Sequence, residues 1–281
     1  MKKELKVEIT HSGLFLDNDI SYTQVPGWLG QATRDLKLSV IRHQDTSKKL
    51  PVLFWFAGGG WMDTHHNIHL PNLIHLAHKG YVIVGVEYRD SNKINFPGQL
   101  QDAKAAIRYI KANADKFGVD VHKVIVMGES AGGHLASMLG VTNGLDQFEI
   151  GNNKEQNSNV NIAVPLYGVV SPLSAKQGSA IRDFDFVYRN LLGAEPENAP
   201  ELNEAANPLS YINNNTVPFL IFHGTKDVIV PAKDSQTLYD ALQAQNIPSD
   251  FYELPDAEHM DPKFLQPEIM DLVDEFVQQH I

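Results

Sequence analysis

The chain has 281 residues, including 34 acidic and 23 Lys or Arg residues, which give a formal net charge of −11. Hydrophobic residues make up 43% and charged residues 20%, which is typical of a globular protein and excludes a disordered chain. The acidic balance argues against nucleic-acid binding, because such binding needs basic side chains to neutralise phosphates. The sequence contains no cysteine, so disulfides, thiolate nucleophiles and Cys-ligated zinc are excluded.

The N-terminal residues 1–9 include lysines but no apolar run of the roughly 7 to 15 residues that a signal peptide needs. The longest nearly apolar stretch, residues 50–62, contains Pro51 and is shorter than the roughly 18 residues of a membrane span. No polybasic segment indicates a membrane surface. The sequence therefore predicts a cytoplasmic protein without a membrane partner.

The predicted secondary structure alternates strands and helices. Segments 6–9 and 36–42 first predict a β-hairpin. Continuous apolar runs then predict strands buried on both faces, at residues 52–56, 81–86, 124–127, 162–166, 219–222 and 250–254. Helical patterns lie between or after them, at residues 72–79, 100–117, 131–140, 235–245 and 267–279. This order predicts an α/β fold in one domain, residues 1–281, with a mostly parallel central sheet flanked by helices.

Two regions interrupt the alternation. Residues 143–159 are rich in Asn, Gln and Gly and predict a surface loop. Residues 171–215 separate two strands and contain an aromatic stretch around Phe184 and Phe186. Because such a long connection inside a compact domain is usually functional, we expect residues 171–215 to form an inserted cap or lid.

The strongest chemical signal is Gly-x-Ser-x-Gly at residues 128–132, with Ser130 at its centre. A buried strand leads into the motif and a helix follows it, which is the strand–turn–helix context that exposes a nucleophilic serine. A chance pentapeptide in a loop would lack this context. The pattern predicts Ser130 as a nucleophile.

A serine hydroxyl needs a general base, and the histidines differ in their suitability. His134 lies one turn along the same helix, and His223 is better suited to support the turn that follows its strand. His259 follows the last strand in a polar loop, where ligand sites of open α/β sheets lie. The sequence thus favours His259 as the base.

The base in turn needs a carboxylate to orient it. Asp227 follows the predicted strand 219–222 and precedes an apolar run. Asp256 and Glu258 are alternatives, but both lie so close to His259 in sequence that a suitable approach is unfavourable. Asp227 is therefore the predicted acid.

An acyl-transfer serine also needs backbone N–H donors for the oxyanion. The stretch Ala57–Trp61 contains three consecutive glycines after a buried strand, and Ala131 follows the serine at a helix N-terminus. A triple glycine alone is weak evidence, since many tight turns contain one. A dinucleotide site is not indicated, because the Gly-x-Gly-x-x-Gly pattern is absent.

Together these motifs resemble the α/β-hydrolase carboxylesterases related to hormone-sensitive lipase and to bacterial feruloyl and acetyl esterases. The matching segments are Ala57–Trp61, Tyr88-Arg89, Phe96-Pro97, Asp102-Ala103, Gly128–Gly133, His223–Asp227 and His259. The resemblance implies an α/β-hydrolase fold, the triad Ser130, Asp227 and His259, and N–H groups of Gly59, Gly60 and Ala131 as oxyanion donors. Ala57 replaces the family's usual histidine, which puts the rigidity of the oxyanion loop in question.

A cluster of histidines invites a metal interpretation, since His65 and His69 have a spacing that places two ligands on one helical face. The motif lacks an accompanying glutamate base, and Pro71 interrupts it. We therefore interpret His65, His66, His69, His75 and His78 as a polar loop and an exposed helix face, and expect no metal.

The sequence predicts a serine carboxylesterase that hydrolyses small short-acyl esters without a cofactor. Trp61 and Met260 are the predicted substrate-binding residues, because each lies next to a catalytic segment and is bulky enough to narrow an acyl pocket. A serine peptidase, an amidase or formamidase, and a non-catalytic ligand receptor of the same fold remain alternatives. Homo-oligomerisation is left open.

Overall fold

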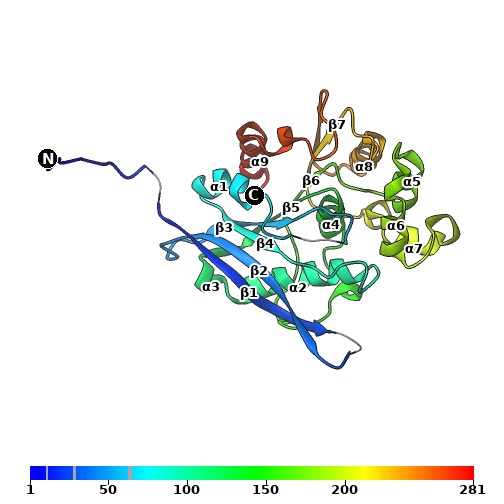
Figure 1. Cartoon of the computed structure of the whole chain (residues 1–281), viewed down its shortest axis with the longest axis horizontal. Coiled ribbons are helices and arrows are strands. Elements are labelled where there is room, and N and C mark those ends of the chain that lie inside the picture. The colour runs from blue at the N-terminus through cyan, green and yellow to red at the C-terminus, as the bar shows by residue number, and fades with distance from the viewer. Residues whose placement is uncertain (11, 28–29, 63–64) are drawn as a thin grey trace.

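The computed structural model describes residues 1–10, 12–27, 30–62 and 65–281 (Figure 1). Its centre is a sheet with strand order β1-β2-β4-β3-β5-β6-β7-β8. The β1–β2 and β2–β4 pairs are antiparallel, and all the other pairs are parallel. The strands are β1 (Leu14–Pro26), β2 (Thr33–His43), β3 (Leu50–Phe56), β4 (Val82–Val86), β5 (Val119–Glu129), β6 (Ile162–Leu166), β7 (Phe219–Gly224) and β8 (Ser249–Leu254).

Helices cover both faces of this sheet. They are α1 (Leu70–His78), α2 (Gly98–Ala112), α3 (Ala114–Phe117), α4 (Ala131–Val141), α5 (Pro172–Gly178), α6 (Phe186–Leu192), α7 (Pro200–Ala205), α8 (Ala232–Ala244) and α9 (Pro267–His280). Short 3₁₀ turns are η2 (Asp146–Phe148), η3 (Arg182–Phe184), η4 (Pro196–Asn198), η5 (Pro208–Tyr211) and η6 (Pro262–Leu265). Helices α1 and α9 pack on one face, whereas α2, α4 and α8 pack on the other. In the described residues, no helix is both long and apolar enough to span a bilayer.

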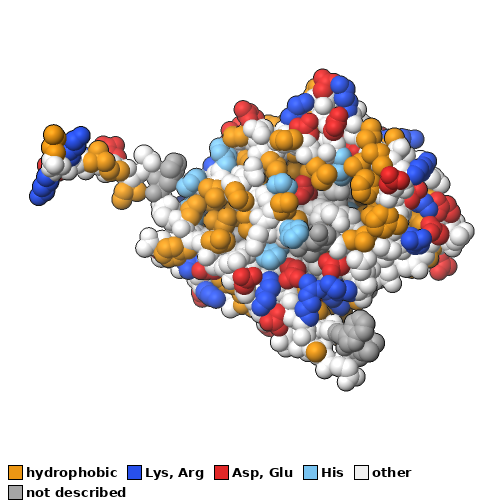
Figure 2. Space-filling model, in the orientation of Figure 1, with side chains coloured by type: hydrophobic (Ala, Val, Ile, Leu, Met, Phe, Trp, Pro, Cys, Tyr) orange, Lys and Arg blue, Asp and Glu red, His pale blue; other side chains and the backbone are white. Residues whose placement is uncertain are grey.

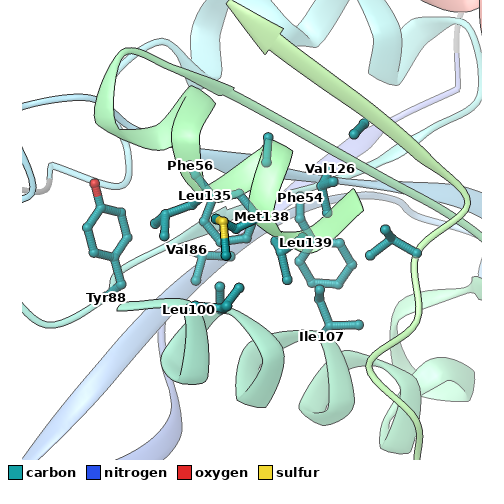
Figure 3. Packing of buried hydrophobic residues seen from close by; sticks show 14 of the residues in the cluster. Phe54, Phe56, Val86, Tyr88, Leu100, Ile107, Val126, Leu135, Met138 and Leu139 are labelled. Atoms are coloured by element: carbon teal, nitrogen blue, oxygen red, sulfur yellow. The ribbon is translucent and has the colours of Figure 1, made fainter. Parts of the chain in front are cut away.

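The core explains why the strands are continuously apolar. Phe54 and Phe56 of β3 point toward α2 and α4, while Leu53 and Trp55 point toward α1 and α9, and all four are fully buried. Figure 3 shows α4 and α2 side chains, such as Leu139 and Ile107, packed on the sheet. Since burying one large apolar side chain contributes about 1.5–3 kcal/mol, both faces stabilise the sheet strongly. The predicted mostly parallel α/β fold is confirmed.

The N-terminal hairpin differs from its prediction. Residues 6–9 form no strand, and the partner of β2 is the long edge strand β1. Sequence patterning missed β1 because most of its residues are exposed or half-buried, so it shows no clear apolar face. The predicted helix 100–117 is also divided, at Asn113, into α2 and α3.

The connection between β6 and β7, residues 171–215, contains α5, α6 and α7 and is not a structureless loop. It is tied to the body by His134 of α4, whose Nε2 lies 2.7 Å from the carbonyl oxygen of Ala206. The His134 ring also meets Trp61 edge-on, with centroids 5.2 Å apart. This buried contact joins the connection to the α4 helix.

His134 predicts an acid-sensitive step in stability. Burial lowers the pKa of His134 to about 4, below the value of about 6.5 expected in the unfolded chain. The unfolded state therefore binds the proton first, and this site lowers the unfolding free energy by about 3 kcal/mol as the pH falls from about 6.5 to 4. Denaturant unfolding of the wild type and of His134→Phe, measured across this range, should show a shallower decline for the variant. Parallel declines would contradict the assignment, whatever the stability of the variant at neutral pH.

Candidate active site

Ser130 lies at a sharp turn between β5 and α4. Its φ of 51° and ψ of −116° are unfavourable for a residue with a side chain, so the surrounding packing must hold the turn. Close approach explains the neighbouring glycines. A Cβ on Gly132 would lie 1.9 Å from the carbonyl oxygen of Phe56, and one on Gly128 would lie 2.4 Å from that of Gly132. The sequence motif thus forms the strained turn that it predicts.

The structure brings Ser130, His259 and Asp227 together from three distant segments. The Oγ of Ser130 lies 2.9 Å from Nε2 of His259, and Nδ1 of His259 lies 2.6 Å from Oδ2 of Asp227. Both His259 and Asp227 have buried side chains. The Asp227 carboxylate can only accept a hydrogen bond, so the ring proton of His259 lies on Nδ1. The Nε2 atom of His259 is then free to accept the proton of Ser130.

Asp227 is held as a buried anion. Its Oδ1 accepts hydrogen bonds of 2.9 Å from the backbone N–H groups of Ile229 and Val230. Burial acts to raise the pKa of Asp227, but His223 and His259 outweigh it and hold that pKa well below its usual range. The Asp227 carboxylate therefore stays ionised at neutral pH.

His223 is a second buried histidine that lies beside Asp227. Its Nδ1 lies 2.7 Å from the Ser235 hydroxyl, while Nε2 faces the Val230 carbonyl at 3.0 Å and Asp227 Oδ2 at 3.2 Å. Two acceptors beside Nε2 require the proton there, with Ser235 donating to Nδ1. This matches the supporting role that the sequence suggested for His223.

The alternative residues lie in other surroundings. Asp256 is mostly exposed and pairs with Lys226 at 2.6 Å, and Glu258 is exposed. His134 is fully buried and is bonded to a backbone carbonyl. In the described structure, none of these three side chains is hydrogen-bonded to Ser130 or His259, and His134 meets Ser130 only through the backbone of the first helical turn, where its N–H donates to the Ser130 carbonyl at 3.0 Å.

The predicted oxyanion residues line the same pocket as the serine. This pocket of about 330 Å³ is bordered by Gly59, Gly60 and Ala131 as well as by Ser130 and His259. Trp61 and Met260 line it too. Trp61 is only 1% exposed and packs against Tyr188 with ring centroids 6.2 Å apart, whereas Met260 is 64% exposed at the mouth. Trp61 is thus both a core residue and a pocket wall.

The remaining pocket wall is almost entirely apolar. Its side chains are those of Met62, Val169, Phe184, Phe186, Val187, Tyr188, Ile229 and Val230. Four of these, from Phe184 to Tyr188, lie within residues 171–215, so that segment borders the pocket. No Lys, Arg, Asp or Glu side chain is among the described lining residues. An uncharged ligand fits such a wall better than an ionic one, because an unpaired charge would lose its hydration.

Sequence reasoning missed Glu129, the residue before the serine. Its Oε1 accepts from the Gly58 N–H at 3.4 Å and lies 3.3 Å from His69 Nε2, and its Oε2 accepts from the Tyr167 hydroxyl. Burial acts to raise the pKa of Glu129, but bonds from His69 and Tyr167 lower it below its usual value. The Tyr167 ring lies edge-on to His259, with centroids 4.8 Å apart.

This carboxylate therefore connects the triple-glycine loop, the serine turn and, through Tyr167, His259. The loop has a second tether, since the Tyr88 hydroxyl donates to the carbonyl of Ala57 at 2.8 Å. Two side chains from elsewhere, Glu129 and Tyr88, thus hold the loop that has alanine at position 57. The signal in the sequence was Glu129 itself, a charged residue at the end of a buried strand. A buried polar group is almost always hydrogen-bonded, so such a residue indicates nearby donors.

The histidines between residues 65 and 78 are directed to different partners. His69 pairs with Glu129, the His75 Nε2 lies 2.7 Å from Asp271, and His66 Nε2 lies 3.3 Å from the Ser39 hydroxyl. In the parts of the chain that the structure describes, no three His, Asp or Glu side chains are grouped so as to hold a metal ion. The three histidines named here thus have separate partners.

Comparisons with known proteins identify the family of this chain. The sequence model of the family BD-FAE matches residues 38–242. Esterase LipC of Mycobacterium tuberculosis is 31% identical over 225 residues, which cover 79% of this chain and 56% of that protein. The chain spans about half the length of the curated relatives it matches, such as LipC, LipM and LipQ.

Solved structures show the same fold. A thermophilic esterase from Thermogutta terrifontis has a TM-score of 0.75 at 25% identity, covering 93% of this chain and 91% of that one. A truncated carbohydrate esterase from gut microbiota has a TM-score of 0.80 at 22% identity, covering 98% of both chains. The resemblance found in the sequence is confirmed: the chain belongs to the BD-FAE family and has the α/β-hydrolase fold of carboxylesterases.

Proposed function

We propose that this protein is a serine carboxylesterase acting on small, uncharged, short-acyl esters. The observation that carries the proposal is the hydrogen-bonded chain Ser130–His259–Asp227 at the wall of an apolar pocket. The names of the relatives support ester hydrolysis, since LipC and the Thermogutta protein are called esterases.

The chemistry follows from the positions of these groups. Ser130 Oγ attacks the ester carbonyl while His259 Nε2 takes its proton, and Asp227 stabilises the resulting imidazolium. Backbone N–H groups of Gly59, Gly60 and Ala131 stabilise the oxyanion of the tetrahedral intermediate. The imidazolium returns its proton to the leaving alcohol, and water, deprotonated by the same histidine, then releases the acid from Ser130. Residues 171–215 act as a cap that excludes bulk water from this pocket.

A substrate panel tests the proposal and separates its alternatives. p-Nitrophenyl esters of graded acyl length are compared with p-nitroanilides, formamides and short peptides. We expect kcat/KM for esters to exceed that for the amides by several orders of magnitude. Faster cleavage of amides would favour a peptidase or amidase instead, and inertness toward every substrate would favour a ligand receptor.

The size of the acyl pocket gives a further prediction. Each methylene that fits gains about 0.8 kcal/mol, whereas one that does not fit costs about 1 to 3 kcal/mol in strain. We therefore expect kcat/KM to peak at short acyl chains and to fall about tenfold or more beyond the limit, since 1.36 kcal/mol is a factor of ten. Trp61→Ala should move the peak to longer chains as well as lower stability, by about 3–5 kcal/mol.

Trp55→Ala is the matched control, because Trp55 is equally buried but is not among the residues that line the pocket. It should lower stability without moving the peak. A wild-type preference for palmitate, or the same shift in both variants, would show that Trp61 does not limit the pocket.

Glu129 should act as a positioning residue. Glu129→Gln keeps the size of the side chain but replaces one carboxylate oxygen by an N–H₂ group. This new donor would lie against another donor, from His69, Gly58 or Tyr167, so that a hydrogen bond is lost. We expect kcat to fall about 10- to 100-fold with little change in KM, because small displacements of catalytic groups cost up to about 10²-fold. Tyr167→Phe, which keeps the ring against His259, should lose less. If Glu129→Gln retains wild-type kcat at neutral pH, the carboxylate is not needed to position the loop.

A further inference from the structure

The N-terminal segment, residues 4–10, has the pattern of a β-strand without a partner. Leu5, Val7 and Ile9 alternate with Lys6 and Glu8, which is the period of two of a strand. The segment extends away from the body of the protein, and its side chains lie along it as an alternation of hydrophobic and charged groups (Figures 1 and 2). It pairs with none of the described strands.

The apolar side chains of this segment lie in water. Leu5, Val7 and Ile9 are 84%, 76% and 92% exposed, respectively. Such a segment presents an unpaired row of backbone N–H and C=O groups together with an apolar face, which is the arrangement that favours pairing with another strand. One added antiparallel strand would pair the backbone groups along one edge of the segment and place its apolar side chains beside those of the partner.

The segment is complementary to itself. When two copies run antiparallel about a two-fold axis through Val7, Lys6 of each copy faces Glu8 of the other, and Leu5 faces Ile9. Apolar residues then face only apolar residues, and the two-fold axis generates two Lys6–Glu8 pairs in the dimer. A register centred on Leu5 also pairs opposite charges, but it places Lys3 against Val7.

We propose that the protein forms a two-fold homodimer in which residues 4–10 of two copies pair as antiparallel strands with Val7 opposite Val7. The contact is small, and two-stranded ribbons are only marginally stable, so the dimer is reversible and concentration-dependent. The proposal is independent of the esterase activity.

Charge exchange tests the partner and the register. Sedimentation of the full chain is measured from micromolar to millimolar concentration. Glu8→Lys and Lys6→Glu each create two like-charge pairs, and we expect each to weaken dimerisation at least about tenfold, or about 1.4 kcal/mol. The double variant Lys6→Glu/Glu8→Lys restores opposite pairs and should dimerise like the wild type. Lys2→Glu is the control, because Lys2 faces no charged residue in this register.

The result is decisive in each direction. A wild type that is monomeric at every concentration overturns the proposal. So does a dimer that persists in both single variants, or a double variant that stays monomeric. An unchanged thermal unfolding transition in every variant shows that the body of the protein is intact.

A disulfide test fixes the register independently, since the chain has no native cysteine. In the proposed dimer, Val7→Cys places two thiols opposite each other, within the Cα separation of about 4.4–6.8 Å that a disulfide requires. Leu5→Cys places its thiols four residues apart along the paired strands. Mild oxidation should therefore cross-link the Val7→Cys variant much faster. Equal rates, or faster cross-linking of Leu5→Cys, would overturn this register.

Discussion

Replacing Ser130 by alanine should lower kcat for a short-chain p-nitrophenyl ester on the order of 10⁶-fold, as loss of a triad nucleophile does. The reason is that His259 would then have no hydroxyl to deprotonate, while the pocket and the oxyanion donors remain. The residual rate should still exceed the uncatalysed rate, because binding and oxyanion stabilisation survive. Steady-state and single-turnover kinetics measure both quantities.

Ser137→Ala is the matched control for this change. Ser137 lies on α4, the helix that follows Ser130, and it is fully buried outside the pocket. Its variant should keep wild-type kcat. A serine-reactive phosphonate should also label the peptide that contains Ser130 and no other serine peptide. Retention of most activity by Ser130→Ala would remove the serine-nucleophile mechanism altogether.

Replacing Asp227 by asparagine should cost on the order of 10⁴-fold in kcat, since the amide stabilises the wrong tautomer of the histidine. The amide N–H₂ would donate to Nδ1 of His259, which moves the imidazole proton to Nε2 and directs it at Ser130. The loss should be partly recovered at high pH, where hydroxide replaces the missing base. A pH profile of kcat/KM for the wild type and the variant measures this.

Asp256→Asn and Glu258→Gln are the controls, and both should stay within a few-fold of the wild type, because in the described structure neither side chain is hydrogen-bonded to the histidine. The reverse ranking would assign the orienting acid to the loop around His259.

Asp227 should also support folding. Because its pKa is lowered in the folded state, its contribution to stability is present at neutral pH and disappears as the solution becomes strongly acidic.

The parallel part of the sheet could be predicted because its strands are buried on both faces. Val52–Phe56 and Ile162–Leu166 are continuous apolar runs, and such runs have few other uses in a globular protein. The edge strand β1 could not be predicted in the same way, since most of its side chains face water. Its strand conformation depends on pairing with β2, and the sequence of β1 alone does not encode that pairing.

The sequence by itself determined the three residues of the proposed triad, because a glycine-flanked serine turn and polar residues at strand ends are local features. It also determined where the triple-glycine loop lies. Only the tertiary structure decided how that loop is held without a histidine at position 57. Glu129, His69 and Tyr167 are far apart in sequence, and they meet only after β3, β5 and β6 have paired. A buried carboxylate such as that of Glu129 is stable only when other groups donate hydrogen bonds to it. Whether a residue is buried depends on the whole folded chain and cannot be seen in any one segment.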